Sequence, residues 1–209
     1  MDNNIWIDTR LNEEEMNFLN DAVSKEKENW NNDPNRKISQ YGAERDLIDK
    51  DNWFYETVLK KLTEKIFYRD WNAYYKYHIE KEEPLPEFVM NSMWVNYMKQ
   101  HEITPIHDHK GLCSFVVFMK IPTHWKEQHA LPHTIFCEKE VGPAASNFAF
   151  LLGHGDGTVY PHQIHLSPED EGRMVFFPAW LKHMVYPFYE CEEIRVTISG
   201  NIDFKLQQF

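Results

Sequence analysis

The sequence predicts an α+β chain that is mainly β: a double-stranded β-helix, or jelly-roll barrel, backed by N-terminal helices. A change of pattern along the chain indicates this fold. Apolar residues recur every three or four positions in the first third, whereas short apolar segments between Gly, Pro, Asp and Asn follow from residue 88 onward. A chain of 209 residues commonly folds as one all-β domain. We therefore expect a single domain over 1–209, with a helical supporting region over 1–86 and a jelly-roll core over 87–209.

Two amphipathic helices are expected in the supporting region. The first begins after Asn12, whose side chain suits a helix N-cap, and three glutamates occupy its first turn. The second begins near Asp51 and ends before Pro84. Its apolar stripe repeats every four residues and consists of Phe54, Val58, Leu62 and Ile66. Such a stripe predicts that the helix packs against a sheet.

Seven strands are expected in the rest of the chain. Each is a short apolar or alternating segment bounded by turn residues. They cover residues 88–90, 93–98, 112–121, 147–152, 173–177, 183–188 and 194–204. The segment 122–146 contains three histidines, three prolines and Trp125 without a clear period. Long ordered loops are often binding loops, so we expect this segment to contact the substrate.

Composition excludes several functional classes. The formal charge of −11 predicts repulsion from nucleic acids and from anionic membranes, and no run rich in Lys and Arg offers a local exception. No apolar run is long enough to cross a membrane, and the N-terminus does not resemble a signal peptide. Cys113, Cys137 and Cys191 form no CxxC motif, which is typical of reduced thiols. We therefore expect a cytoplasmic protein without a nucleic-acid or membrane partner.

Three histidines are the candidate metal ligands. His107 and His109 lie two positions apart, so on an extended strand their side chains share one face, with Cα atoms roughly 7 Å apart. His183 lies in a strongly apolar run, where a surface histidine is not expected. A core histidine bonded to the backbone is the alternative at this position. Imidazoles that converge from two segments are suited to a transition metal such as iron.

Residues 193–199 predict a strand that carries an arginine to the same region. Alternation places Arg195, Thr197 and Ser199 on one face of this strand and three aliphatic residues on the other. A guanidinium that faces a barrel interior needs an anion, and a dicarboxylic acid bound to the metal would provide one. A salt bridge to Glu193, which lies on the same face, is the alternative.

These motifs together carry a resemblance to a known superfamily. Besides the His-x-His pair, it rests on Asn96, on Ser114 with its apolar strand, and on two longer segments. These are Gly-Arg-Met-Val-Phe-Phe-Pro-Ala-Trp-Leu-Lys-His at 172–183 and Arg-Val-Thr-Ile-Ser-Gly-Asn-Ile at 195–202. In this order and spacing they resemble the 2-oxoglutarate/Fe(II)-dependent oxygenases, and most closely the prolyl-hydroxylase-like group of bacteria and phages. The resemblance covers residues 90–205 and leaves out the N-terminal third.

The resemblance implies an iron site. By this resemblance, His107 would be the first ligand of Fe(II) and His183 the distal one. The superfamily usually places Asp or Glu two residues after the first histidine, whereas this chain has His109 there. Two ligand sets remain open: three histidines, or a local bulge that turns Asp108 inward and restores a carboxylate. His-x-His occurs in the resembling group, so we favour His107, His109 and His183.

The same resemblance implies that 2-oxoglutarate and O2 are cosubstrates and that the reaction is a hydroxylation. Arg195 would pair through both ends of its fork with the far carboxylate of 2-oxoglutarate, assisted by Thr197 and by the phenol of Tyr97. The expected substrate is a protein side chain such as proline, another peptide group or a small molecule, and a homodimer is an open option. Demethylation of nucleic acids is disfavoured by the net charge.

Two other classes stay open. A cupin-type metal-binding enzyme also uses His-x-His and a later histidine. It usually has a glutamate four or five residues after the second histidine, where this chain has Cys113 and Ser114. It would also leave Arg195 without a role. A non-catalytic jelly-roll binding protein would keep the barrel and lack turnover. Iron-dependent formation of succinate from 2-oxoglutarate distinguishes the oxygenase from both.

Overall fold

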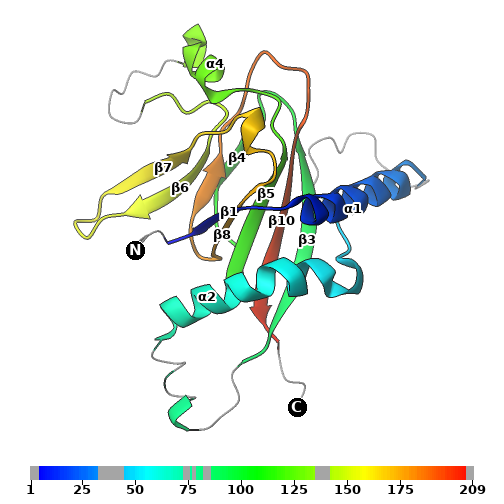
Figure 1. Ribbon diagram of the computed structural model, residues 1–209. Coiled ribbons are helices and arrows are strands. Elements are labelled where there is room, and N and C mark those ends of the chain that lie inside the picture. The colour runs from blue at the N-terminus through cyan, green and yellow to red at the C-terminus, as the bar shows by residue number, and fades with distance from the viewer. Residues whose placement is uncertain are drawn as a thin grey trace.

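The computed structural model describes residues 5–32, 45–72, 76, 79–81, 86–134 and 142–205. Within these residues, ten strands form two antiparallel sheets (Figure 1). The larger sheet has six strands in the order β1-β8-β5-β10-β3-β2, and the smaller has four in the order β4-β9-β6-β7. The fold is mainly β and has the two-sheet jelly-roll architecture that the sequence predicts.

The longest strands, β3 and β10, lie next to each other in the larger sheet. The larger sheet contains β1 (Ile7–Arg10), β8 (Arg173–Pro178), β5 (Cys113–Lys120), β10 (Arg195–Phe204), β3 (Phe88–Met98) and β2 (Arg45–Asp46). The smaller sheet contains β4 (Thr104–His107), β9 (His183–Val185), β6 (Phe148–Gly153) and β7 (Val159–Ile164). The long strand β10 lies between β3 and β5, and it pairs antiparallel with both. It therefore places its residues near the middle of the larger sheet.

Alternation along β5 divides the core into two layers. Phe115 and Val117 belong to the outer layer, in which the larger sheet packs against the helices. Val116 and Phe118 belong to the inner layer, which contains Phe148 and other apolar residues of the smaller sheet. Figure 1 shows α1 and α2 on the outer side of the larger sheet, away from the smaller one. The inner layer is therefore the space in which a buried site can form.

The first helix begins where its capping residue predicts. In α1 (Glu13–Asn32), the Asn12 carboxamide accepts a hydrogen bond from the Glu15 amide at 3.0 Å. The Glu15 carboxylate accepts one from the Asn12 amide at 2.9 Å, which completes a capping box. The second helical region consists of a 3₁₀ turn η1 (Lys50–Asn52), a π-helical turn η2 (Tyr55–Leu59) and α2 (Lys60–Asp70). The predicted start near residue 51 is therefore confirmed.

The strands that the sequence predicts are present, but the supporting region is not purely helical. Residues 88–98 form one continuous strand instead of two. Two strands from the region 1–86, β1 and β2, extend the larger sheet at its two edges. The segment 122–146 contains α4 (Trp125–Ala130) and the 3₁₀ turn η3 (Pro132–Thr134), while 135–141 lies outside the described residues. None of the helices that the structure describes is long and apolar enough to cross a membrane.

Candidate active site

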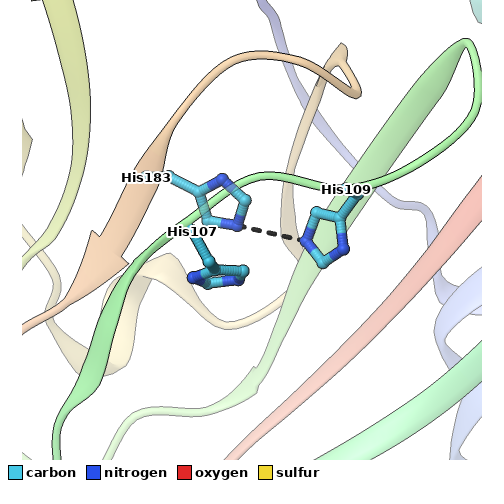
Figure 2. Close-up of side chains that lie close together, drawn as sticks. All are labelled: His107, His109 and His183. Carbon is cyan, nitrogen blue, oxygen red and sulfur yellow. Dashed lines mark hydrogen bonds between the residues drawn. The ribbon is translucent and has the colours of Figure 1, made fainter.

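The three predicted histidines converge between the two sheets. His107 at the end of β4 is paired in register with His183 at the start of β9, so their side chains lie side by side. His109 follows β4, and its backbone amide donates to the carbonyl of Ala179 at 2.9 Å. This bond holds the His109 backbone against the turn that connects β8 to β9 and leads to His183. Figure 2 shows the three imidazole rings gathered around one point.

The distances between the rings are suited to a single metal ion. The ring centroids of His107 and His183 are 4.2 Å apart, and the other two pairs are each 5.0 Å apart. The Nε2 atoms of His109 and His183 are 3.3 Å apart. One nitrogen from each ring lies within 4.8 Å of the others. This spacing allows one nitrogen from each ring to bind the same ion.

Backbone carbonyls select the tautomer of two of these histidines. Nδ1 of His107 lies 2.8 Å from the carbonyl oxygen of Pro105, and Nδ1 of His183 lies 3.0 Å from that of Leu181. A carbonyl oxygen only accepts, so each Nδ1 carries the proton and donates. Each Nε2 then keeps its lone pair for a metal. Outer contacts of this kind orient metal-ligating histidines and raise their basicity.

Burial keeps two of the imidazoles neutral at pH 7. It lowers the pKa of His183 from 6.5 to about 3, because the charged ring would lose its hydration. It also lowers the pKa of His109 to about 4, with a smaller contribution from the neighbouring His107. A metal binds the neutral form of histidine. The site therefore presents unprotonated nitrogens to a metal without first releasing protons at neutral pH.

The low pKa of His183 predicts acid sensitivity of the metal-free protein. The unfolded state binds a proton near pH 6.5 while the folded state resists it until about pH 3. This contribution to stability is therefore complete above pH 6.5 and is lost as the pH falls toward 3. We expect His183 to lower the free energy of unfolding in this range by roughly 1 kcal/mol per pH unit, to which the lowered pKa of His109 adds a similar contribution. Urea denaturation between pH 7 and 5 checks this, and a His183→Ala variant with an equal slope would contradict it.

Asp108 faces away from the histidines. Its carboxylate accepts a hydrogen bond from Nζ of Lys182 at 2.5 Å, and about half of its side chain is exposed. This bond lowers the pKa of Asp108, which is therefore a charged surface partner of Lys182. The bulge that would turn Asp108 inward is not formed. The alternative carboxylate ligand is thus not supported by the geometry, and the three-histidine set stays the prediction.

A pocket of about 150 Å³ connects the histidines to the predicted cosubstrate residues. It lies in the inner layer between the sheets. Its lining includes the three histidines and, from β10, Arg195, Thr197 and Ser199. Its apolar walls include Trp94, Val116, Phe118, Phe148 and Leu166. The volume equals that of about five water molecules, which is the scale of a small metabolite rather than of a drug-sized ligand.

Arg195 is a buried guanidinium without a carboxylate partner among the described residues. It is 1% exposed, and burial lowers its pKa to about 10. Nη2 donates to the backbone carbonyl and the hydroxyl of Ser146, and Nη1 donates to the sulfur of Met98 at 3.9 Å, while Nε has no partner in the described part of the chain. Glu193 pairs instead with Lys120, so the alternative salt bridge to Arg195 is excluded. A buried cation of this kind is suited to an anionic ligand in the pocket.

The structure corrects the prediction for Tyr97. This residue lies on the outer face of β3, where its hydroxyl donates to the Glu26 carboxylate at 3.2 Å. The alternation of the strand instead directs Asn96 to the pocket, where its amide lies 3.5 Å from the Thr197 hydroxyl. A Tyr97 contact with 2-oxoglutarate does not fit this arrangement. Asn96 carried part of the resemblance, but the sequence did not indicate that it lines the site.

The residues present fit both an iron ion and a small dicarboxylic acid. The metal candidates are three imidazoles, a donor type that iron accepts. Arg195, whose Nε has no partner among the described residues, and Thr197 line the same pocket and can supply donors for a carboxylate. Ser114, by contrast, donates to the carbonyl of Gly200 and stands apart from the histidines. The carboxylate ligand of a cupin therefore has no counterpart there.

Comparison with known proteins identifies the family. Residues 92–201, more than half of the chain, match the family described as "Putative 2OG-Fe(II) oxygenase". The chain therefore belongs to the 2OG-Fe(II) oxygenase family, an enzyme family whose cofactors are Fe(II) and 2-oxoglutarate. No curated protein matches the chain.

Solved structures show the same fold at low identity. A prolyl-4-hydroxylase from Pseudomonas putida is 12% identical with a TM-score of 0.52, and the match covers 99% of this chain and 95% of that one. AviO1 from Streptomyces viridochromogenes Tue57 is 11% identical with a TM-score of 0.52, covering 95% and 89%. The non-heme alpha ketoglutarate dependent carbocyclase SnoK from nogalamycin biosynthesis is 8% identical with a TM-score of 0.55, covering 96% and 79%. The chain spans only 46% of a Burkholderia pseudomallei 2OG-Fe(II) oxygenase family oxidoreductase, with 10% identity and a TM-score of 0.39.

Proposed function

We propose that this protein is a 2-oxoglutarate- and Fe(II)-dependent dioxygenase that hydroxylates a substrate at the pocket between the sheets. The observation that carries the proposal is the presence of two unlike features in one pocket. Three imidazoles converge on one point, and a buried guanidinium without a carboxylate partner among the described residues lies in the same lining. A metal site alone does not require Arg195, and an anion site alone does not require three converging histidines.

Each group in the pocket has a role in this proposal. His107, His109 and His183 would hold Fe(II), which, together with 2-oxoglutarate, supplies the oxidising power for breaking a C–H bond with O2. Arg195 and Thr197 bind the far carboxylate of 2-oxoglutarate by charge-assisted and neutral hydrogen bonds. The apolar walls exclude water from the reacting centre and so strengthen these electrostatic contacts.

The third imidazole changes the charge of the site. A neutral histidine in place of a carboxylate leaves the metal centre one unit more positive than in the usual ligand set. A more positive centre attracts the anionic cosubstrate more strongly in a dry pocket. It also changes the potential of the metal. Turnover in this protein therefore has to be measured directly.

Iron-dependent succinate formation tests the proposal. The purified protein, reconstituted with Fe(II) without oxygen and then exposed to air and 2-oxoglutarate, is expected to release succinate. The metal-free protein serves as the control. A cupin-type enzyme or a non-catalytic barrel would release none, and that result would contradict the proposal even if the metal were bound.

For the substrate we propose a peptide side chain, with proline as the first candidate. The similarity in fold to a prolyl-4-hydroxylase supports this choice. A small molecule is the second candidate, because the carbocyclase SnoK from nogalamycin biosynthesis shares the fold at a comparable score. Mass spectrometry of proline-containing peptides after incubation decides between them by the gain of one oxygen atom. We further propose a cytoplasmic setting, supported by the free thiols of Cys113 and Cys191. Cys137 lies outside the described residues. We also propose that the protein has no nucleic-acid partner, which the net charge of −11 supports.

A further inference from the structure

The two ends of the segment 122–146 meet beside Arg195. Thr123 lies shortly after β5, and Ser146 lies two residues before β6. Both residues are buried, and their side-chain oxygens are 2.8 Å apart. This pair of hydroxyls therefore closes the base of the segment at a point that it shares with the guanidinium.

Ser146 contacts the guanidinium twice. Nη2 of Arg195 donates to the backbone carbonyl of Ser146 at 3.0 Å and to its hydroxyl oxygen at 2.6 Å. Arginine has five N–H donors in a rigid fork, and these two bonds use both donors of Nη2. Nη1 donates one N–H to the sulfur of Met98 at 3.9 Å, so the donors left for a ligand are that of Nε and the second N–H of Nη1. The ring of Phe188 packs against the guanidinium with 4.8 Å between its centroid and Cζ.

Ser146 has a backbone conformation that serine rarely adopts. Its φ is +69°, in the left-handed region that favours glycine. Its amide donates to the carbonyl of Pro187 at 2.8 Å, which fixes this conformation. A glycine would have the same backbone shape with less strain but would lack the hydroxyl. A strained serine at this position is explained if its hydroxyl has a function.

We propose that Ser146 is a positioning residue for the cosubstrate. Its hydroxyl, held by Thr123, orients the Arg195 guanidinium so that the free donors face the pocket. The protein thereby prefers a 2-oxo acid that has a second carboxylate over one that lacks it. This inference rests on the proposed function, because it assumes that the anion in the pocket is 2-oxoglutarate.

The test compares two 2-oxo acids in a Ser146→Gly variant. The full chain is loaded with Mn(II) in place of Fe(II), so that no turnover occurs, and is titrated in a calorimeter. The ligands are 2-oxoglutarate and 2-oxopentanoate, which has the same chain length but no second carboxylate. We expect Ser146→Gly to weaken 2-oxoglutarate binding about tenfold, the effect of losing one hydrogen bond to a charged group, and to leave 2-oxopentanoate binding unchanged. Thr123→Val is expected to change the ratio in the same direction by less.

A matched control isolates the effect of glycine at a positive φ. Asn52 has a φ of +56°, is exposed and does not line the pocket, so Asn52→Gly should leave both affinities unchanged. Equal loss of both ligands in Ser146→Gly, or an unchanged ratio, would overturn the inference while the proposed function stands. A wild-type protein without preference for 2-oxoglutarate would overturn both. If Ser146→Gly fails to fold, as judged by thermal unfolding, the ratio in Thr123→Val decides.

Discussion

Replacing His183 by alanine is expected to abolish stoichiometric Fe(II) binding. His183 is 2% exposed, its Nδ1 is fixed by a backbone carbonyl, and its Nε2 is directed to the point where the three rings meet. No other described residue can replace it, since the nearest carboxylate in sequence to the pair, Asp108, is held by Lys182. Loss of an outer contact alone typically weakens metal binding about 10–100-fold, so loss of a ligand should weaken it by more than about 100-fold. Metal content per chain after anaerobic reconstitution measures this.

Two further variants make the His183 result specific. Asp108→Asn should keep nearly full metal content, because its side chain faces solvent. His162→Ala removes a histidine from β7 of the smaller sheet, whose ring contacts that of Trp6 at a tilted angle, and should also keep the metal. Full metal content in His183→Ala would contradict the three-histidine site. A loss in Asp108→Asn as large as in His107→Ala would instead assign the ligand to the carboxylate.

Substituting Arg195 by lysine should weaken 2-oxoglutarate binding tenfold or more while the fold survives. Lysine keeps the positive charge but loses the planar fork, so it cannot contact Ser146 and a carboxylate in the same way. Each charge-assisted hydrogen bond contributes about 1.5–3 kcal/mol, and about 1.4 kcal/mol corresponds to a tenfold change in affinity. Calorimetric titration of the protein under argon gives the affinity.

The surface arginine of β8 supplies the matched control for Arg195. Arg173 forms ion pairs with Asp8 and Asp170 outside the pocket, so Arg173→Lys should leave the affinity for 2-oxoglutarate unchanged. Unchanged affinity in both Arg195→Lys and Arg195→Ala would remove the cosubstrate from the proposed function. Loss of affinity in Arg173→Lys would indicate an effect on the fold rather than on the site.

The strands with an unambiguous apolar pattern could be predicted from the sequence, and the polar edge strands could not. β5 and β8 are buried on both faces, so they stand out as continuous apolar runs. β7 contains a proline and is mostly exposed, and β2 has only two residues. Such segments become strands because a neighbour supplies hydrogen bonds, which is information that lies elsewhere in the chain.

The candidate site was predictable where spacing alone decides the geometry. Side chains alternate between the two faces of a strand, so residues two positions apart share a face. This alternation places His107 with His109, and Arg195 with Thr197. The error at Tyr97 has the same origin, because β3 is apolar on both faces and its sequence does not say which face is inner. The proposed role of Ser146 could not be predicted from the sequence, since it depends on a turn conformation with a positive φ that no sequence pattern indicates.

Because β4 pairs directly with β9, a bound metal would stabilise this edge of the smaller sheet in addition to its role in the chemistry. β4 is an edge strand of four residues whose register shifts before His107, and it is flanked by the exposed side chain of Ile103 and carries that of Ile106. An ion held by His109 and His183 would cross-link residues 74 positions apart and remove chain entropy from the loosened state. Among the described residues no strand pairs with the outer side of β4, and the cross-link would hold in place this edge, whose backbone and apolar side chains otherwise form a template for aggregation. Bound iron would then increase the resistance of this protein to aggregation as well as enable its chemistry.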